Sequence, residues 1–306
     1  MDAGEYDAVV GCTDLYYHDT GMYGTSDYGS VYVVDADRPA VVDTGIGTNV
    51  ETLVETIHDV GIDADELEYV LPTHAHLDHA GGAGFLAEAF PEATVLTHER
   101  GVDHLVDPER LVEGTKSAVG DQWEFYVDPE PVPEDRIEGL TDGDTVDLGD
   151  RTLEAVACPG HAPHQVAFHD DGDDALFTGD AAGIYVADRD AVKATTPPPQ
   201  FDLDQARRDA AALAERDPDH LCFGHFGPRP FDAELLSRYQ RTLVEWVEAV
   251  RRKRAELDDD DAVADHFAEH ADLDDVWTAR KAAEEERLNV RGVLAFLDCR
   301  AAEGAE

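Results

Sequence analysis

The sequence is poor in positive charge. Its 306 residues contain 23 Lys and Arg against 69 Asp and Glu, which gives a formal net charge of −46. Because the acidic residues are spread along the whole chain, we interpret them as an adaptation to a high-salt cytoplasm, where salt screens the self-repulsion of an acidic coat. The same charge repels phosphate backbones. It therefore disfavours nucleic-acid binding in dilute salt, and less so in molar salt.

Cysteine and long apolar runs are also scarce. The four cysteines form no C-x-x-C pair, which favours a reduced, cytoplasmic protein. No apolar stretch approaches the roughly 18 residues that span a bilayer, and residues 1–10 lack the basic and apolar regions of a secretion signal. We therefore expect no membrane partner. Hydrophobic residues still make up 42% of the chain, which is enough to bury a core and excludes a disordered protein.

Up to about residue 230, short β-branched runs alternate with helical patterns. Two runs around the polar turn at 35–39 predict a β-hairpin over 31–45. Apolar residues at helical spacing predict a helix over 49–60. By the same criteria we expect strands at 68–71, 94–97, 146–148, 153–157, 165–169, 175–178 and 221–223, and helices at 80–90 and 203–215.

After Phe231 the strand signals end and helical patterns continue. A long helix is expected over 233–255, the acidic run 258–261 breaks it, and 262–299 offers two or three more helices. We therefore place a boundary near residue 230, before a C-terminal helical extension over 231–306. Apolar residues of the long helix, such as Leu243 and Val247, need a partner, either in the same chain or across a homodimer interface.

One short segment concentrates potential metal ligands. Three histidines and a carboxylate fall within six residues of the segment Thr73-His74-Ala75-His76-Leu77-Asp78-His79. The segment follows a predicted strand, and at a strand-to-helix turn these side chains would converge on one point. Imidazole and carboxylate are ligands that borderline divalent metals such as zinc prefer. A cluster this dense indicates a metal site rather than a polar surface loop.

Three later segments each add one polar ligand. His161 stands in C-P-G-H, Asp180 in L-F-T-G-D and His225 in F-G-H-F-G. Each follows an apolar run that predicts a strand. Each also stands beside glycine, where the backbone can turn tightly.

Taken in order, these motifs resemble those of the metallo-β-lactamase-fold hydrolases, in which T-H-x-H-x-D-H precedes P-G-H, F-T-G-D and a final G-H. The match covers about residues 31–227. The resemblance implies an α/β fold, a four-layer αββα sandwich with the metals at one edge between the sheets, here followed by a C-terminal helical appendage. It also implies that residues 1–230 form the catalytic domain and that 99–136 is a lid insertion.

The resemblance further implies a division of the ligands. One metal would be held by His74, His76 and His161, the second by Asp78, His79 and His225, and Asp180 would bridge both. Asp43 matches a family position whose side chain orients a ligand histidine without itself binding a metal. Two such metals can hold a bridging water and lower its pKa from 15.7 towards about 7, so that the hydroxide attacks a carbonyl carbon or a phosphorus. Asp78 is the catalytic candidate, because it is placed to orient that water or receive its proton.

Other residues have weaker signals and open alternatives. His164 could support a ligand, contact the substrate or only cap a turn. Tyr185 could stabilise an oxyanion, as a tyrosine near this position does in some family lactonases, or pack beside the mouth of the site. The aromatic residues Trp123, Phe125 and Tyr126 could line an apolar pocket or pin the lid to the core.

The motif layout is closest to that of glyoxalase II, or hydroxyacylglutathione hydrolase. We therefore predict a dinuclear metal-dependent hydrolase that acts on a small-molecule thioester or ester. Three alternatives stay open: an RNase Z-like phosphodiesterase with the same seven ligands, a lactonase, and a persulfide dioxygenase with one iron. We expect two divalent ions, zinc before iron or manganese, although the ligands suit all three.

Overall fold

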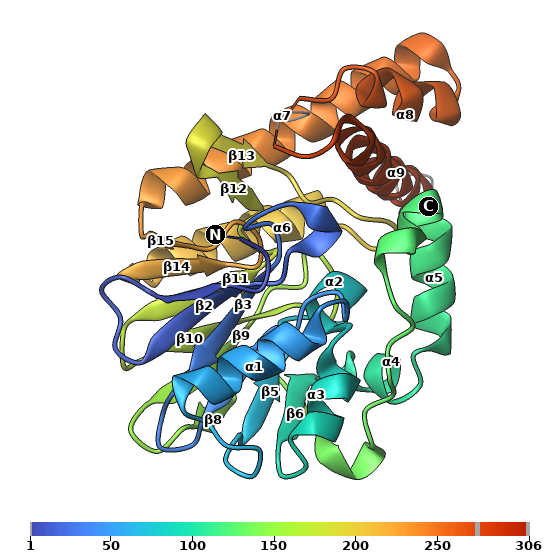
Figure 1. Cartoon of the computed structure of the whole chain (residues 1–306). Coiled ribbons are helices and arrows are strands. Elements are labelled where there is room, and N and C mark those ends of the chain that lie inside the picture. Colours follow the sequence, from blue (N-terminus) through green and yellow to red (C-terminus); the bar gives the residue numbers. More distant parts are fainter. Residues whose placement is uncertain (1, 273–275, 304–306) are drawn as a thin grey trace.

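Two β-sheets face each other at the centre of the protein, with helices on their outer faces (Figure 1). The computed structural model describes residues 2–272 and 276–303. The first sheet has the order β1-β2-β3-β4-β5-β6-β7, made of Tyr6–Ala8, Leu15–Asp19, Ser30–Val34, Ala40–Val42, Tyr69–Leu71, Thr94–His98 and Ile137–Leu140. The second has the order β15-β14-β11-β10-β9-β8, made of Pro228–Pro230, His220–Phe223, Ala175–Gly179, Val166–Asp170, Thr152–Ala157 and Thr145–Asp147. A separate hairpin joins β12 (Ile184–Val186) to β13 (Ala191–Lys193).

The α-helices connect and cover these strands. In chain order, α1 to α9 are Val50–Val60, Leu77–Ala80, Ala83–Ala89, Val102–Val106, Glu109–Val119, Leu203–Glu215, Ala233–Leu257, Asp260–Ala268 and Ala279–Glu303. The helix predicted over 203–215 and the hairpin predicted over 31–45 are confirmed by α6 and by the antiparallel pair β3–β4.

Strand β3 shows why the sheets are apolar on both faces. Its alternate side chains point to opposite faces. Tyr32 and Val34 join the apolar cluster between the sheets, where Tyr32 contacts Phe177. Val31 and Val33 pack on the other face beneath the helices. Since both faces are covered, every residue of β3 is buried, and the run is β-branched rather than alternating in polarity. The predicted helix–sheet–sheet–helix layering is confirmed.

The C-terminal helices bury the apolar stripe of α7 within the same chain. Leu243 and Val247 join one cluster with Val263 of α8 and Val290 of α9. The acidic run does end α7, because Asp258 takes a left-handed conformation with φ of 52°. In the described part of the chain, no helix combines the length and the apolar character needed to cross a membrane.

The single helix predicted over 80–90 is wrong in its bounds. Helix α2 begins earlier, at Leu77, and the helix is interrupted at Gly81 and Gly82 before α3 begins. A Cβ on Gly82 would lie 2.5 Å from the Thr44 carbonyl oxygen, so the backbone approaches the neighbouring loop more closely than any side chain allows. The short strands β1, β2, β7, β12, β13 and β15 and the helices α4 and α5 within residues 99–136 were not predicted.

A buried histidine in the first sheet makes stability depend on pH. His18 of β2 is fully buried, with Nδ1 2.9 Å from Thr56 Oγ1, and burial lowers its pKa from 6.5 to about 4. In the unfolded chain, His18 is protonated below about pH 6.5. In the folded chain, it is protonated only below about pH 4. Stability is therefore lost as the pH falls through this window, by about 3 kcal/mol.

This dependence is tested by urea unfolding of the wild type and His18→Asn between pH 4 and 8. Asparagine keeps a polar atom near the Nδ1 position for Thr56 but does not titrate. We expect the free energy of unfolding of the wild type to fall relative to that of the variant as the pH drops from 6.5 to 4. Parallel curves would contradict the assignment to His18.

Candidate metal centre

The histidine-rich segment is positioned by two parallel strands that end side by side. Strand β5 ends at Leu71 and β4 at Val42, and their registers align these two residues. Asp43 follows β4 in a left-handed conformation with φ of 61°, and its Oδ1 accepts from the backbone N–H of Thr73 at 2.7 Å and from the Thr73 hydroxyl at 2.8 Å. This pair of bonds fixes the start of the segment that carries His74 and His76.

The remaining candidate ligands come from loops of the second sheet and from α2. Asp78 and His79 lie in α2, where the His76 carbonyl accepts from the backbone N–H groups of His79 and Ala80. Asp180 directly follows β11 and His225 follows β14. These two strands are parallel neighbours, so their carboxyl ends meet at one edge. His161 follows β9.

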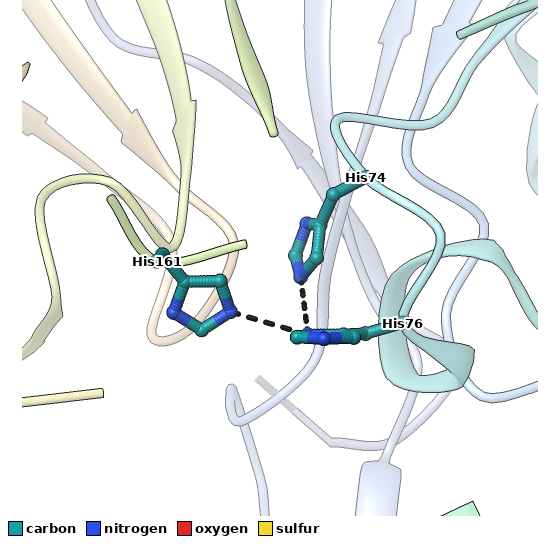
Figure 2. Close-up of side chains that lie close together, drawn as sticks. All are labelled: His74, His76 and His161. Atoms are coloured by element: carbon teal, nitrogen blue, oxygen red, sulfur yellow. Dashed lines mark hydrogen bonds between the residues drawn. The ribbon is translucent and has the colours of Figure 1, made fainter. Parts of the chain in front are cut away.

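The structure brings all seven predicted ligands together. They form three overlapping groups in which the potential ligand atoms lie within 4.8 Å of one another: His74, His76 and His161; His74, His79 and Asp180; and Asp78, His79 and His225. In the first group, His76 Nδ1 lies 2.9 Å from His74 Nε2 and 3.1 Å from His161 Nε2 (Figure 2).

Hydrogen bonds outside the cluster fix which ring nitrogen faces inwards. The Thr73 hydroxyl donates to Asp43, so its oxygen accepts from His74 Nδ1 at 3.1 Å. His161 Nδ1 donates to the Thr195 carbonyl at 3.4 Å, and His225 Nδ1 donates to the Tyr28 carbonyl at 2.9 Å. In the neutral ring the other nitrogen then carries a lone pair. His74, His161 and His225 therefore all present an Nε2 lone pair to the interior of the cluster.

Asp180 lies at the centre of these lone pairs. Its Oδ1 is 3.4 Å from His79 Nε2 and 3.3 Å from His225 Nε2, and its Oδ2 is 3.4 Å from His161 Nε2. Among the described residues, Asp180 Oδ1 and His79 Nε2 are buried without any hydrogen-bond partner. A buried polar atom left in this way is costly unless an ion or water satisfies it.

His79 is held from outside by a carboxylate. Its Nδ1 donates to Asp43 Oδ2 at 2.9 Å. Burial alone would lower the pKa of His79, but the carboxylates of Asp43, Asp180 and Asp78 raise it well above the usual value. The excess negative charge that favours a proton on His79 is charge that a divalent cation would also compensate.

The other pKa shifts match ligand protonation states. Burial lowers the pKa of His74 and His161, and lowers that of His76 to about 3, so these rings are neutral near pH 7. Burial alone would raise the pKa of Asp180, yet the imidazoles of His161, His79 and His225 lower it well below the usual range. Neutral imidazole and ionised carboxylate are the forms that bind metals.

These observations fit divalent ions. Ligand atoms at about 2.0–2.1 Å from a tetrahedral ion are roughly 3.3 Å apart, and the Asp180 contacts to imidazole nitrogens are 3.3–3.4 Å. Inward lone pairs beside ionised carboxylates repel one another without a cation. The donor set is imidazole and carboxylate, which zinc, iron and manganese all accept.

A cavity of about 370 Å³ opens onto the cluster. Asp78 borders it with 27% of its side chain exposed, more than the other cluster carboxylate, Asp180, at 7%. Apolar residues form much of the wall: Leu77, Leu111, Val119, Ile184, Pro197, Pro198, Pro199 and Leu288.

Two weaker candidates separate in the structure. His164 is buried in the cavity wall, and its Nδ1 accepts from the Ala75 backbone N–H at 3.2 Å. Tyr185 is not among the residues that line the cavity, because side chains alternate along β12 and Ile184 faces the site instead. The Tyr185 hydroxyl donates to Asp190 at 3.2 Å.

The aromatic residues of the segment 99–136 were expected either to line a pocket or to pack against the core, and both roles occur. Tyr126 lines the cavity, where its hydroxyl contacts that of Tyr23. Trp123 stacks on Tyr126 with ring centroids 5.1 Å apart and lies outside the lining.

Two walls of the cavity come from segments outside the predicted ligands, and the sequence did not predict the first of them. Tyr23 and Tyr28 come from the loop after β2, and Tyr28 stacks on the His225 ring with centroids 4.7 Å apart. The other wall is one face of α9, formed by Lys281, Glu285, Leu288 and Asn289 at positions i, i+4, i+7 and i+8. This helical spacing was the available signal for the second wall.

The comparison with protein families decides the classification. The model described as "Metallo-beta-lactamase superfamily" matches residues 24–225. The chain belongs to the metallo-beta-lactamase superfamily. The superfamily assignment confirms the resemblance at that level. Helix α9 lies outside the matched residues, so this wall of the cavity is not described by the family pattern.

Relatives within the superfamily carry different names. The metallo-beta-lactamase fold-containing protein ST1585 of Sulfurisphaera tokodaii is 27% identical over 221 residues, 71% of this chain and 79% of the relative. A solved ST1585 structure aligns with a TM-score of 0.70 at 21% identity, covering 92% of this chain and 99% of that one, which shows the shared fold. Human acyl-coenzyme A thioesterase MBLAC2 is 25% identical over 189 residues, 54% of this chain and 62% of the relative. The N-acyl homoserine lactonase AttM of Azorhizobium caulinodans is 31% identical over 124 residues, 39% and 41% of the two chains.

Replacing Asp43 tests how the site is held. In Asp43→Asn, the amide oxygen can still accept from Thr73, but the amide nitrogen then faces the Nδ1–H of His79. This donor–donor clash favours the ring tautomer that has no lone pair on Nε2. We expect metal affinity to fall about 10- to 100-fold, measured by competition with a chromophoric chelator.

A matched control is Asp170→Asn. Asp170 is also a buried carboxylate, but it pairs with Arg151 at 3.2 Å, away from the cluster. This variant should lose thermal stability and keep its metal affinity. Equal affinity in Asp43→Asn and the wild type would show that Asp43 does not orient His79.

Proposed function

We propose that the protein is a dinuclear metal-dependent hydrolase of small thioesters or esters. His74, His76 and His161 would hold one ion, Asp78, His79 and His225 the other, and Asp180 both. The observation that carries this proposal is the convergence of inward Nε2 lone pairs on Asp180, whose buried Oδ1 has no hydrogen-bond partner among the described residues. When bound, divalent ions supply Lewis acidity and a water whose pKa is lowered to near neutrality.

The chain's own residues orient the reaction. Asp78 is the more exposed of the two cluster carboxylates and lines the cavity, so it is placed to accept a hydrogen bond from the attacking water and to take up its proton. Its pKa is lowered: burial alone would raise it, but the imidazoles of His79 and His225 more than offset burial. Asp78 is therefore ionised near pH 7, as an acceptor must be. Asp43 holds His79 and Tyr28 holds His225, which limits ring rotation.

The cavity supports an acyl substrate of modest size. Its apolar wall suits an acyl chain, and the α9 face adds a charged pair in which Lys281 Nζ lies 2.6 Å from Glu285 Oε2. The relatives named as a thioesterase and as a lactonase both act on acyl compounds by their names. A thioesterase related in motif layout to glyoxalase II is our first choice, with a lactonase second.

The metal, the cellular location and the domain organisation are also proposals. We propose zinc as the resident metal, with iron and manganese as alternatives that the same ligands accommodate. The cytoplasmic location, the adaptation to high salt and the division into residues 1–230, a lid at 99–136 and an extension over 231–306 are proposed on the grounds given above. A homodimer would have to use another surface, because Leu243 and Val247 are buried within the same chain. Phosphodiester cleavage and persulfide oxidation are outcomes of the test.

The test is turnover of three substrate classes by the purified protein in molar KCl with added Zn²⁺. We expect cleavage of S-lactoyl thioesters or of a lactone, abolished by a chelator and restored by the metal. Cleavage of bis-p-nitrophenyl phosphate alone would replace the proposal with a phosphodiesterase. A single bound iron with oxygen uptake on a persulfide would replace hydrolysis with oxidation.

A further inference from the structure

His164 occupies the wall of the active-site cavity without belonging to any of the three ligand groups. Only 7% of its surface is exposed. Its ring centroid lies 5.5 Å from that of His76 and 6.1 Å from that of His74, and the ring of His104 from α4 lies 5.6 Å away on the lid side. His164 thus sits between the ligand cluster and the lid region, at the cavity surface.

One hydrogen bond fixes the tautomer of His164. The backbone N–H of Ala75 donates to Nδ1 at 3.2 Å. Nδ1 must therefore present a lone pair, and the ring proton is on Nε2. Within residues 2–272 and 276–303, no protein atom accepts a hydrogen bond from Nε2. His79 Nε2 is a fully buried atom without a hydrogen-bond partner, whereas His164 Nε2 is not fully buried.

A buried, fixed N–H donor beside a reaction centre has a specific use. A neutral imidazole N–H is too weak an acid to transfer its proton near pH 7. It can, however, stabilise negative charge by donating a hydrogen bond, as neutral histidines do when they polarise a carbonyl. Such preorganised donors act in the transition state, because the charge on oxygen develops there.

We propose that His164 Nε2–H donates to the carbonyl oxygen of the substrate's acyl group and stabilises the oxyanion. This inference rests on the proposed ester or thioester hydrolysis. In that reaction the water oxygen bonds to the acyl carbon, the bond from that carbon to the leaving sulfur or oxygen breaks, and a proton from the water ends on the leaving group. His164 keeps its proton throughout.

The alternative is a purely structural role, in which His164 only holds the backbone of Ala75 between His74 and His76. Two conservative substitutions separate the two roles, because each keeps one ring nitrogen's function. In His164→Asn, the amide oxygen lies near the Nδ1 position and can still accept from Ala75, but the Nε2 donor is gone. In His164→Gln, the amide nitrogen lies near the Nε2 position and can still donate to the substrate, while the acceptor for Ala75 is gone.

The two roles are separated by kcat and KM of both variants on the thioester that the wild type cleaves best, with metal content as the structural readout. We expect His164→Asn to lose about 10²–10³-fold in kcat with KM and both metals unchanged. His164→Gln should stay within about tenfold of the wild type. The reverse order, with asparagine active and glutamine impaired or metal-poor, would overturn the proposal and assign His164 to bracing.

A second readout does not depend on turnover. Long-range ¹H–¹⁵N spectra of the ¹⁵N-histidine-labelled, metal-loaded protein should show His164 with a protonated Nε2, assigned by its loss in His164→Gln. Saturation with butyrate, a carboxylate of the product class, should shift the Hε2 signal and slow its exchange. A proton on Nδ1, or no response to butyrate, would overturn the inference even if the wild type hydrolyses esters. If the wild type cleaves no acyl substrate, the proposed function fails and this spectrum alone decides the donor role.

Discussion

Asp180→Asn is expected to lower kcat/KM by at least about 10³-fold and to leave fewer than two metal ions per chain. The carboxylate contacts three imidazole nitrogens at 3.3–3.4 Å. The amide that replaces it has one oxygen, no negative charge and an NH₂ group that repels cations. Losing one preorganised electrostatic contact typically costs 10²–10³-fold, and Asp180 is placed to serve both ions. Metal analysis and steady-state kinetics measure the two effects.

The fold should survive this substitution. Asparagine has nearly the shape of aspartate, and Asp180 lies after β11 rather than in the apolar core. The unfolding midpoints of Asp180→Asn and the wild type should therefore differ little when both are measured in excess chelator. Full activity of Asp180→Asn with two bound ions would exclude Asp180 as the shared ligand.

Removing the metal ions should destabilise the wild type strongly. A ligand that binds only the folded state at about 1,000 times its Kd stabilises by about 4 kcal/mol, so two ions contribute roughly twice that. For a chain of 306 residues, an unfolding entropy of about 2.1 cal/mol/K per residue means that each kcal/mol shifts Tm by about 1.5 °C. We therefore expect Tm to fall by more than about 10 °C in excess chelator, measured by calorimetry in molar KCl.

Asp180→Asn is the matched control for this effect. Since the variant holds its ions weakly, its Tm should change much less with chelator than that of the wild type. When Zn²⁺ is restored, the Tm of the wild type should return to its starting value. The Tm of Asp180→Asn should rise little. A wild-type Tm that is insensitive to chelator would contradict a site whose lone pairs and carboxylates need cations.

The sequence predicted the parts of the site that are local in the chain. His74, His76, Asp78 and His79 lie within six residues, and their convergence follows from one strand-to-helix turn. The three distant ligands were found because each follows a strand in a short recognisable motif. The helical bounds of α2 were misjudged, since the close backbone approach at Gly82 depends on a loop far along the chain.

The remaining parts depend on contacts between distant segments. Tyr28 stacks on His225 although 197 residues separate them, and no local pattern encodes that pairing. Lys281 and Glu285 border the cavity because the tertiary fold places one face of α9 against it, and the helical pattern alone does not show which face that is. Tyr185 does not line the cavity for a local reason. Neighbouring residues of a strand point to opposite faces of the sheet, and Ile184 takes the face towards the cavity.

If the seven side chains form a dinuclear site, two cations bind there. The most direct measurement is the anomalous difference density of crystals grown with Zn²⁺, collected on both sides of the zinc absorption edge. We expect two peaks, one among His74, His76 and His161 and one among Asp78, His79 and His225, with Asp180 contacting both. A single peak, or peaks only elsewhere on the acidic surface, would contradict a dinuclear site.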